Sequence, residues 1–269
     1  MTPLQPIKGK LPLYLLLLII AAGLMAMLKY CSHPESTDND TKSGGDTLDI
    51  AIEISPIALS TRADTLGGFY YDLMRHIAAS ENIPVKFIPF SQIDNAFDRL
   101  EQGRYDIVIA DLPVTTAMKE KFLFTDPIAL DREILVQLKD SVSGKPKAMT
   151  QHDLRGDTVW IPAGSPFRDR LINLSHEIGD TIYILEDPDY ASEQLVMLVA
   201  LGDIPRAVVN EQIARPMLKQ YPRLDLSVDI SFTQFQSWAV NHNRPDLRDS
   251  LNIWLQRHKA YTDQLRRRY

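Results

Sequence analysis

The sequence predicts an α/β fold of two lobes preceded by an N-terminal membrane segment, and three observations lead to this prediction. Short apolar strands alternate with helical segments in a βαβαβ pattern over residues 48–110. The alternation resumes after a connector rich in Ser, Gly, Lys and Pro at residues 141–149. The run from Leu11 to Leu28 contains 18 residues and no charge.

The composition excludes several classes of protein. The chain has 269 residues and is 45% hydrophobic, which suffices for one large or two small globular domains. Its 29 basic and 35 acidic residues give a net charge of −6, which argues against nucleic-acid binding through a basic surface. Cys31 is the only cysteine, so an intrachain disulfide and every cysteine-based zinc site are excluded. The six histidines form no close metal-binding pair, and we expect neither a metal nor a cofactor.

The first 31 residues predict a membrane anchor or signal segment. Lys8 and Lys10 precede the apolar run and Lys29 closes it. A helix over residues 11–28 would be about 27 Å long, within the usual range for a spanning helix. We expect an uncleaved anchor that holds the domain on the periplasmic side of the inner membrane, with residues 32–46 as a flexible tether. The alternative is a lipoprotein modified at Cys31, although the large Tyr30 precedes that cysteine.

The elements that we expect in the main part of the chain follow from apolar periodicity. A strand at 48–54 precedes a helix opened by Gly67-Gly68 that runs to Asn82. Ser91 is expected to cap a helix that ends at Gly103. The remaining strands are expected at 85–90, 106–110, 132–138, 158–161, 182–185, 207–209, 224–228 and 237–240, and the remaining helices after Ser165, at 192–201, at 212–220 and around Leu247 to Leu255.

Candidate ligand-binding residues follow the ends of strands, because open α/β sheets bind ligands at the carboxyl ends of their strands. These segments are Ser55-Pro56, Asp111 to Thr115, Gly164-Ser165-Pro166, and Asn210-Glu211. A Ser N-cap before Pro166 would leave backbone N–H groups facing a cleft and favour an anion such as a carboxylate. The alternative is that Ser165 only caps its own helix. Asp111 could hold a ligand ammonium or cap its own loop.

Catalytic motifs are absent from the sequence. Ser165 lies in the run Ala163-Gly164-Ser165-Pro166-Phe167, which is not a nucleophile elbow. No phosphate-binding Walker loop and no dinucleotide-binding glycine motif occur. The residues alone therefore support neither nucleophilic hydrolysis nor nucleotide chemistry.

Residues 48–269 resemble the type II periplasmic solute-binding proteins of the amino-acid-receptor class. The resemblance rests on Gly68-Phe69-Tyr70-Tyr71-Asp72-Leu73, on the segment from Leu100 to Ile107, and on Thr115 followed by Phe124-Thr125-Asp126-Pro127. Ser55-Pro56, Pro162-Ala163-Gly164-Ser165 and Trp238-Ala239-Val240 are most similar to the non-catalytic N-terminal domain of membrane-bound lytic murein transglycosylase F.

The resemblance implies two lobes that are joined by a two-strand hinge and close on a small-molecule ligand. The first lobe would comprise residues 47–138 and 230–269, and the second lobe residues 139–229. The ligand-binding positions would be Ser55, Pro56, Asp111, Thr115, Met118, Gly164, Ser165 and Asn210.

Two positions depart from the amino-acid receptors that the sequence resembles. Met118 stands where those receptors use an arginine for the ligand's α-carboxylate, and Asn210 stands where they use an aspartate for the α-ammonium. Each lost charge-assisted hydrogen bond is worth about 1.5–3 kcal/mol, so we expect weak binding of ordinary free amino acids. Lys119 and Lys121 are not spaced to replace the arginine.

Three functional hypotheses remain open at this point. The leading one is a tethered receptor that captures or senses an amino-acid-like solute or a cell-wall fragment, with an ABC permease or a murein-processing enzyme as its partner. The second is an interaction module for murein processing that binds no ligand. The third is a dehydratase-type enzyme, for which Asp111 and Glu211 are the candidate acid–base groups.

Overall fold

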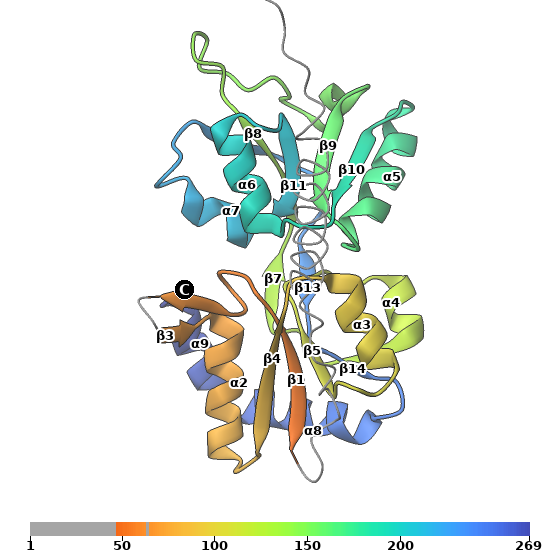
Figure 1. The fold of residues 1–269 in the computed structure, drawn as a ribbon, viewed down its shortest axis with the longest axis vertical. Coiled ribbons are helices and arrows are strands. Elements are labelled where there is room, and N and C mark those ends of the chain that lie inside the picture. Colours follow the sequence, from red (N-terminus) through yellow and green to blue (C-terminus); the bar gives the residue numbers. More distant parts are fainter. Residues whose placement is uncertain (1–46, 63–64) are drawn as a thin grey trace, which may run out of the picture. The chain divides into compact units, whose positions relative to one another are not determined.

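The computed structural model describes residues 47–62 and 65–269, which form two five-stranded sheets covered by helices (Figure 1). The predicted anchor, the tether and Cys31 lie outside the described residues. Among the helices of the described part, none is both long and apolar enough to cross a bilayer.

The first sheet has the order β4-β1-β5-β14-β6. Its parallel core pairs β1 (Leu48–Glu53) with β4 (Val85–Phe90) on one side and with β5 (Ile107–Ile109) on the other. Two short strands extend it: β14 (Ala239–Asn241) pairs antiparallel with β5, and β6 (Phe122–Phe124) pairs antiparallel with β14. Alternate β1 residues face opposite cores, since Ile50 and Ile52 join one buried cluster and Ala51 joins another.

The helices around this sheet are α2 (Phe69–Ser80), α3 (Ile93–Glu101), α4 (Thr116–Lys121), α8 (Pro245–Arg257) and α9 (Lys259–Arg266). The expected helices at 68–82, 91–103 and 247–255 are present, whereas α4 and α9 were not predicted. The predicted cap of α3 is wrong, because Gln92 is the N-cap residue and its side chain makes no capping hydrogen bond. A small hairpin, β2 (Ser60–Arg62) and β3 (Thr65–Gly67), precedes α2.

The second sheet has the order β10-β9-β11-β8-β12. Strands β9 (Thr158–Pro162), β10 (Tyr183–Asp187) and β11 (Arg206–Asn210) are parallel. Strand β8 (Glu133–Leu138) pairs antiparallel with β11, and β12 (Leu224–Asp229) at the edge pairs antiparallel with β8. A short 3₁₀ helix η2 (Gln151–Leu154) precedes β9, and helices α5 (Phe167–Ile178), α6 (Ser192–Leu201) and α7 (Glu211–Met217) follow β9, β10 and β11. Each predicted strand and helix of this unit is present.

The two sheets are connected by a two-stranded antiparallel ribbon of β7 (Ala129–Asp131) and β13 (Gln234–Gln236). Because β8 pairs with β11 and β12, the chain has already entered the second sheet at Glu133. Residues 133–138, predicted to belong to the first lobe, are therefore part of the second sheet. The first crossing, predicted near Leu138, is corrected to β7. The return passes through β13, after β12 ends at Asp229.

Candidate functional site

The carboxyl ends of the parallel strands of the two sheets face each other. In the first sheet these ends belong to β4, β1 and β5, and in the second to β10, β9 and β11. Residues after β4 and after β10 line one pocket, and residues at the ends of β5 and β11 hydrogen-bond to each other. We call this line of contacts the interlobe seam.

One end of the seam is a buried contact between Asp111, which follows β5, and Asn210, the last residue of β11. The Asn210 amide Nδ2 donates to the Asp111 carboxylate Oδ2 at 2.9 Å and also to the Asp111 carbonyl oxygen. Both residues are only 1% exposed. The Oδ1 atom of Asn210 has no hydrogen-bond partner among the described residues. The structure thus brings together two residues that sequence reasoning predicted separately.

Further carboxyl groups surround Asp111. Glu53, at the end of β1, accepts a hydrogen bond from the Asp111 backbone N–H at 2.9 Å. Asp131, at the end of β7, lies against the Asp111 side chain and accepts from the backbone N–H groups of Arg132 and Gln212. The phenol of Tyr70 on α2 faces the Asp111 carboxylate. Glu53, Asp111 and Asp131 form what we call the carboxyl cluster.

Burial makes the charged forms of the carboxyl cluster unfavourable. Desolvation raises the pKa of Glu53 to about 7, and the nearby Asp111 charge adds to this effect. Desolvation also raises the pKa of Asp111, against the hydrogen bond from Asn210, and it raises the pKa of Asp131 with the Asp111 charge beside it. The pKa of Tyr70 lies well above its usual value for the same reason. At neutral pH the cluster therefore retains protons.

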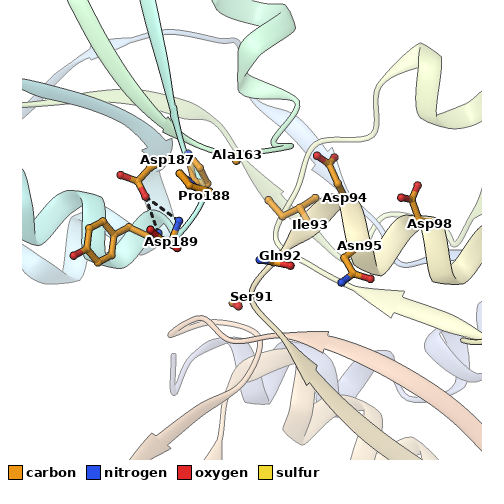
Figure 2. A pocket seen from close by; sticks show the side chains of 12 residues that line it. Ser91, Gln92, Ile93, Asp94, Asn95, Asp98, Ala163, Asp187, Pro188 and Asp189 are labelled. Atoms are coloured by element: carbon orange, nitrogen blue, oxygen red, sulfur yellow. Dashed lines mark hydrogen bonds between the residues drawn. The ribbon is translucent and has the colours of Figure 1, made fainter. Parts of the chain in front are cut away.

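The other end of the seam is an open pocket of about 340 Å³. Figure 2 shows its two sides, with Asp94 and Asp98 on α3, and with Asp187 at the end of β10 and Asp189 in the loop that follows. Asp187 accepts hydrogen bonds from the backbone N–H groups of Asp189 and Tyr190, which fixes the loop. No basic residue lines this pocket among the described residues. An acidic pocket with this lining favours a positively charged solute.

The turn after β9 does not offer the expected anion site. Helix α5 begins at Phe167 with Pro166 as its N-cap residue, so the prediction of a Ser165 cap followed by Pro at the first helical position is wrong. The Ser165 hydroxyl is buried and has no partner among the described residues. The Gly164 N–H donates to the carboxylate of Glu186 at 3.3 Å, and Arg168 pairs with the same side chain. The protein's own carboxylate thus occupies the turn.

A side chain at Gly164 would also obstruct the seam. Its backbone adopts a φ of +71°, and a Cβ atom there would overlap the Asp94 carboxylate of the first lobe. Glycine therefore permits the β9 turn to approach α3.

The remaining predicted site residues lie at the first lobe's strand ends but are engaged locally. The Ser55 hydroxyl accepts from the Ala58 N–H at 3.0 Å and closes the turn that contains the partly exposed Pro56. The Thr115 hydroxyl caps α4 by accepting from the Met118 N–H at 3.2 Å. The half-buried Met118 has an apolar side chain and offers no charge to a carboxylate.

The two candidate acid–base residues, Asp111 and Glu211, are each engaged with other groups. Glu211 accepts from Arg132 Nε at 2.8 Å and from Arg215 on its own helix. Asp229 binds the other side of the Arg132 guanidinium at 2.8 Å. Glu211 is therefore held in an ion-pair network beside the ribbon, whereas Asp111 hydrogen-bonds to Asn210.

Sequence reasoning missed Glu53, Asp131 and the four aspartates of the pocket as site residues. Glu53 had a detectable signal, because it is a charged residue at the carboxyl end of a buried strand. Asp131 gave none, since it lies in a three-residue strand that the sequence pattern did not show.

Two α/β lobes with facing strand ends and a two-strand connection define the class of two-lobed solute-binding domains. Residues 48–269 match the model of the bacterial extracellular solute-binding proteins, family 3, and the chain belongs to that family. The expected type II fold is confirmed by an ancestral arginine-binding protein bound to arginine, with a TM-score of 0.72 and 21% identity over 84% of this chain and 99% of that one. The arginine-binding protein of T. maritima, as its P235GK mutant, aligns with a TM-score of 0.69 and 21% identity over 82% and 93% of the two chains.

The curated relatives are named membrane-bound lytic murein transglycosylase F, as the sequence resemblance predicted. The protein from Aeromonas hydrophila is 25% identical over 225 residues, which cover 83% of this chain and 44% of that protein. The one from Idiomarina loihiensis is 22% identical over 243 residues, which cover 89% and 51%. This chain spans about half the length of these relatives.

Proposed function

We propose that this domain captures or senses a small solute in its interlobe seam, as a binding protein without catalytic activity of its own. The observation that carries the proposal is the seam itself, where strand ends of both lobes meet at a pocket of about 340 Å³. The unpartnered Asn210 Oδ1 and Ser165 Oγ atoms support it, because buried polar groups in folded proteins are normally hydrogen-bonded. Membership of a solute-binding family agrees with this function.

The test is thermal unfolding of the full chain against free amino acids, amines, dipeptides and murein fragments. A solute at 100 times its dissociation constant adds about 2.7 kcal/mol to the free energy of unfolding. This corresponds to a rise of about 5–10 °C in melting temperature for a domain of this size. We expect a rise with one chemical class. No rise with any class would contradict the proposed function.

The second candidate function is an interaction module that holds no solute. The contact between Asn210 and Asp111 favours it, because this contact links the lobes directly with no solute between them. Retention of an open pocket at the other end of the seam argues against it. Under this alternative the solute panel gives no shift, and a murein-processing enzyme captured with the chain becomes the expected partner.

We propose further that residues 11–28 anchor the domain on the periplasmic side of the inner membrane. An ABC permease or a murein-processing enzyme would then receive its signal or solute. The names of the curated relatives, which are membrane-bound, support this location. Under this proposal a Cys31→Ser variant stays in the membrane fraction after an alkaline wash, whereas a lipoprotein would lose its attachment.

A further inference from the structure

Acidic side chains outnumber basic side chains along the seam. At the buried end, Glu53, Asp111 and Asp131 lie together with the amide of Asn210 directed onto Asp111. The unpartnered Oδ1 of Asn210, in a residue 1% exposed, is a further acceptor there. At the open end, Asp94, Asp98, Asp187 and Asp189 line the pocket. Such a surface requires a partner that donates hydrogen bonds.

Most groups that could bind a carboxylate are already engaged, and the unpartnered Ser165 hydroxyl is a neutral donor. The Thr115 hydroxyl and the Met118 N–H bond to each other, and the Gly164 N–H is bonded to Glu186. The Arg132 guanidinium lies between Glu211 and Asp229. A solute carboxylate placed in this seam would therefore meet acidic side chains, while the Arg132 guanidinium is already paired.

A metal ion does not fit the carboxyl cluster. Within residues 47–62 and 65–269, no group of three or more His, Cys, Asp or Glu side chains is arranged to hold one. The carboxylate of Asp111 is turned to the Asn210 amide, and Asp131 accepts from two backbone N–H groups. An ammonium or guanidinium group, with several directed N–H donors, matches these separated acceptors better than a metal ion does.

We propose that the seam binds an organic cation without a carboxylate group, such as a primary amine or a guanidinium compound. The cationic group would displace Asn210 from Asp111 and bind in the carboxyl cluster, and the rest of the solute would extend along the seam toward the acidic pocket. This inference rests on the proposed solute-binding function and defines its substrate class.

The order of the strands places both ends of the seam within reach of one extended solute. In the first sheet the ends of β4 and β5 flank that of β1, and in the second the ends of β10 and β11 flank that of β9. Two neighbouring strand spacings amount to about 10 Å. A four-carbon or five-carbon diamine or guanidine spans a distance of that order.

The test compares agmatine with arginine, because the two share a guanidinium group and differ by the α-carboxylate. Isothermal titration of the full chain at pH 8 is expected to give at least tenfold tighter binding of agmatine. Arginine or glutamate binding as tightly as agmatine, or more tightly, would overturn the inference but leave the proposed solute-binding function intact. Absence of binding by every solute of the panel would overturn both.

Three variants locate the site. Asp111→Asn should weaken agmatine binding at least tenfold, and Asp189→Asn, at an exposed position of the pocket, should weaken it about threefold. The matched control is Asp203→Asn, which removes the same charge from an exposed position before β11, at the opposite end of that strand. It should change the affinity less than twofold. If Asp111→Asn does not fold, the comparison of Asp189→Asn with Asp203→Asn tests the inference by itself. Equal effects of these two variants on agmatine affinity would overturn the inference.

Discussion

The raised pKa of Glu53 makes the stability of this domain depend on pH. The carboxyl is 6% exposed at the end of an apolar strand, and desolvation raises its pKa to about 7. The unfolded chain releases this proton near pH 4.5, so between pH 4.5 and 7 the folded state binds a proton that the unfolded state has lost. The stability that this group contributes is present below pH 4.5 and is lost as the pH rises through 7.

A Glu53→Gln variant removes this titration and keeps an acceptor for the Asp111 N–H. We expect it to unfold with a free energy about 3 kcal/mol higher than wild type at pH 8 and nearly equal to wild type at pH 4.5. Urea unfolding at both pH values measures the difference. Glu101→Gln, at an exposed position of α3, serves as the matched control. An equal gain at both pH values would show that the proton is not responsible.

Gly68 is the residue where the backbone of the first lobe tolerates no side chain. It has a φ of +136°, and an added Cβ atom would overlap the Ala58 carbonyl. We expect Gly68→Ala to lower the free energy of unfolding by about 2–4 kcal/mol. Its neighbour Gly67 has room, since a Cβ there would lie 3.5 Å from the Tyr269 hydroxyl, so Gly67→Ala should cost less than about 1 kcal/mol. Chemical denaturation compares them, and equal losses would contradict the steric account.

At the scale of elements, a buried ion pair holds the amino end of β11. Arg206 Nη1 contacts Asp157 at 2.5 Å, and the Arg206 side chain is only 4% exposed. Asp157→Ala leaves this guanidinium buried without its carboxylate and should cost about 3–5 kcal/mol. Lys147 binds the same carboxylate from an exposed position, so Lys147→Ala should cost less than about 1 kcal/mol. Similar losses in the two variants, measured by urea unfolding, would mean that burial does not decide the effect.

The long elements were predictable because their apolar residues follow one period. The helix α6 occupies 192–201 as predicted, and β1 and β4 lie within a residue of their expected bounds. The ribbon of β7 and β13 was missed, since its strands are three residues long and include the polar residues Asp131, Gln234 and Gln236. That omission moved the predicted lobe boundary to Leu138.

The candidate site was predictable only in part, for a related reason. Strand ends located Asp111 and Asn210, because topology alone brings strand ends to one edge of a sheet. Their direct hydrogen bond could not be predicted, since it depends on how the two sheets face each other. The role of Ser165 was predicted from local spacing, and the structure placed Pro166 at the cap instead.

At the scale of the whole molecule, the seam couples protonation to the arrangement of the lobes. Opening would admit water to the carboxyl cluster and favour its charged forms, so closure is expected to weaken as the pH rises. The groups that face the carboxyl cluster are the phenol of Tyr70 and the amide of Asn210. Two arginine charges act around it, since burial raises the pKa of Tyr70 against the Arg266 charge and raises the pKa of Glu133 against the Arg170 charge.

This coupling can be measured as a distance between spin labels on the two lobes. In a Cys31→Ser background, labels at Glu120→Cys on α4 and His176→Cys on α5 occupy exposed positions. Without solute we expect the mean distance to increase between pH 5.5 and pH 8.5, and a Glu53→Gln variant to show a smaller increase. A distance that is independent of pH would contradict a link between the carboxyl cluster and closure.

The most direct test of solute capture between the lobes is the same label distance at pH 8.5 with and without saturating agmatine. A cation bound in the seam replaces the lost protons, so we expect agmatine to restore the short distance found at pH 5.5, and arginine at the same concentration to do so far less. If calorimetry shows agmatine bound while the distance stays long, the solute is not held between the lobes and the account is wrong.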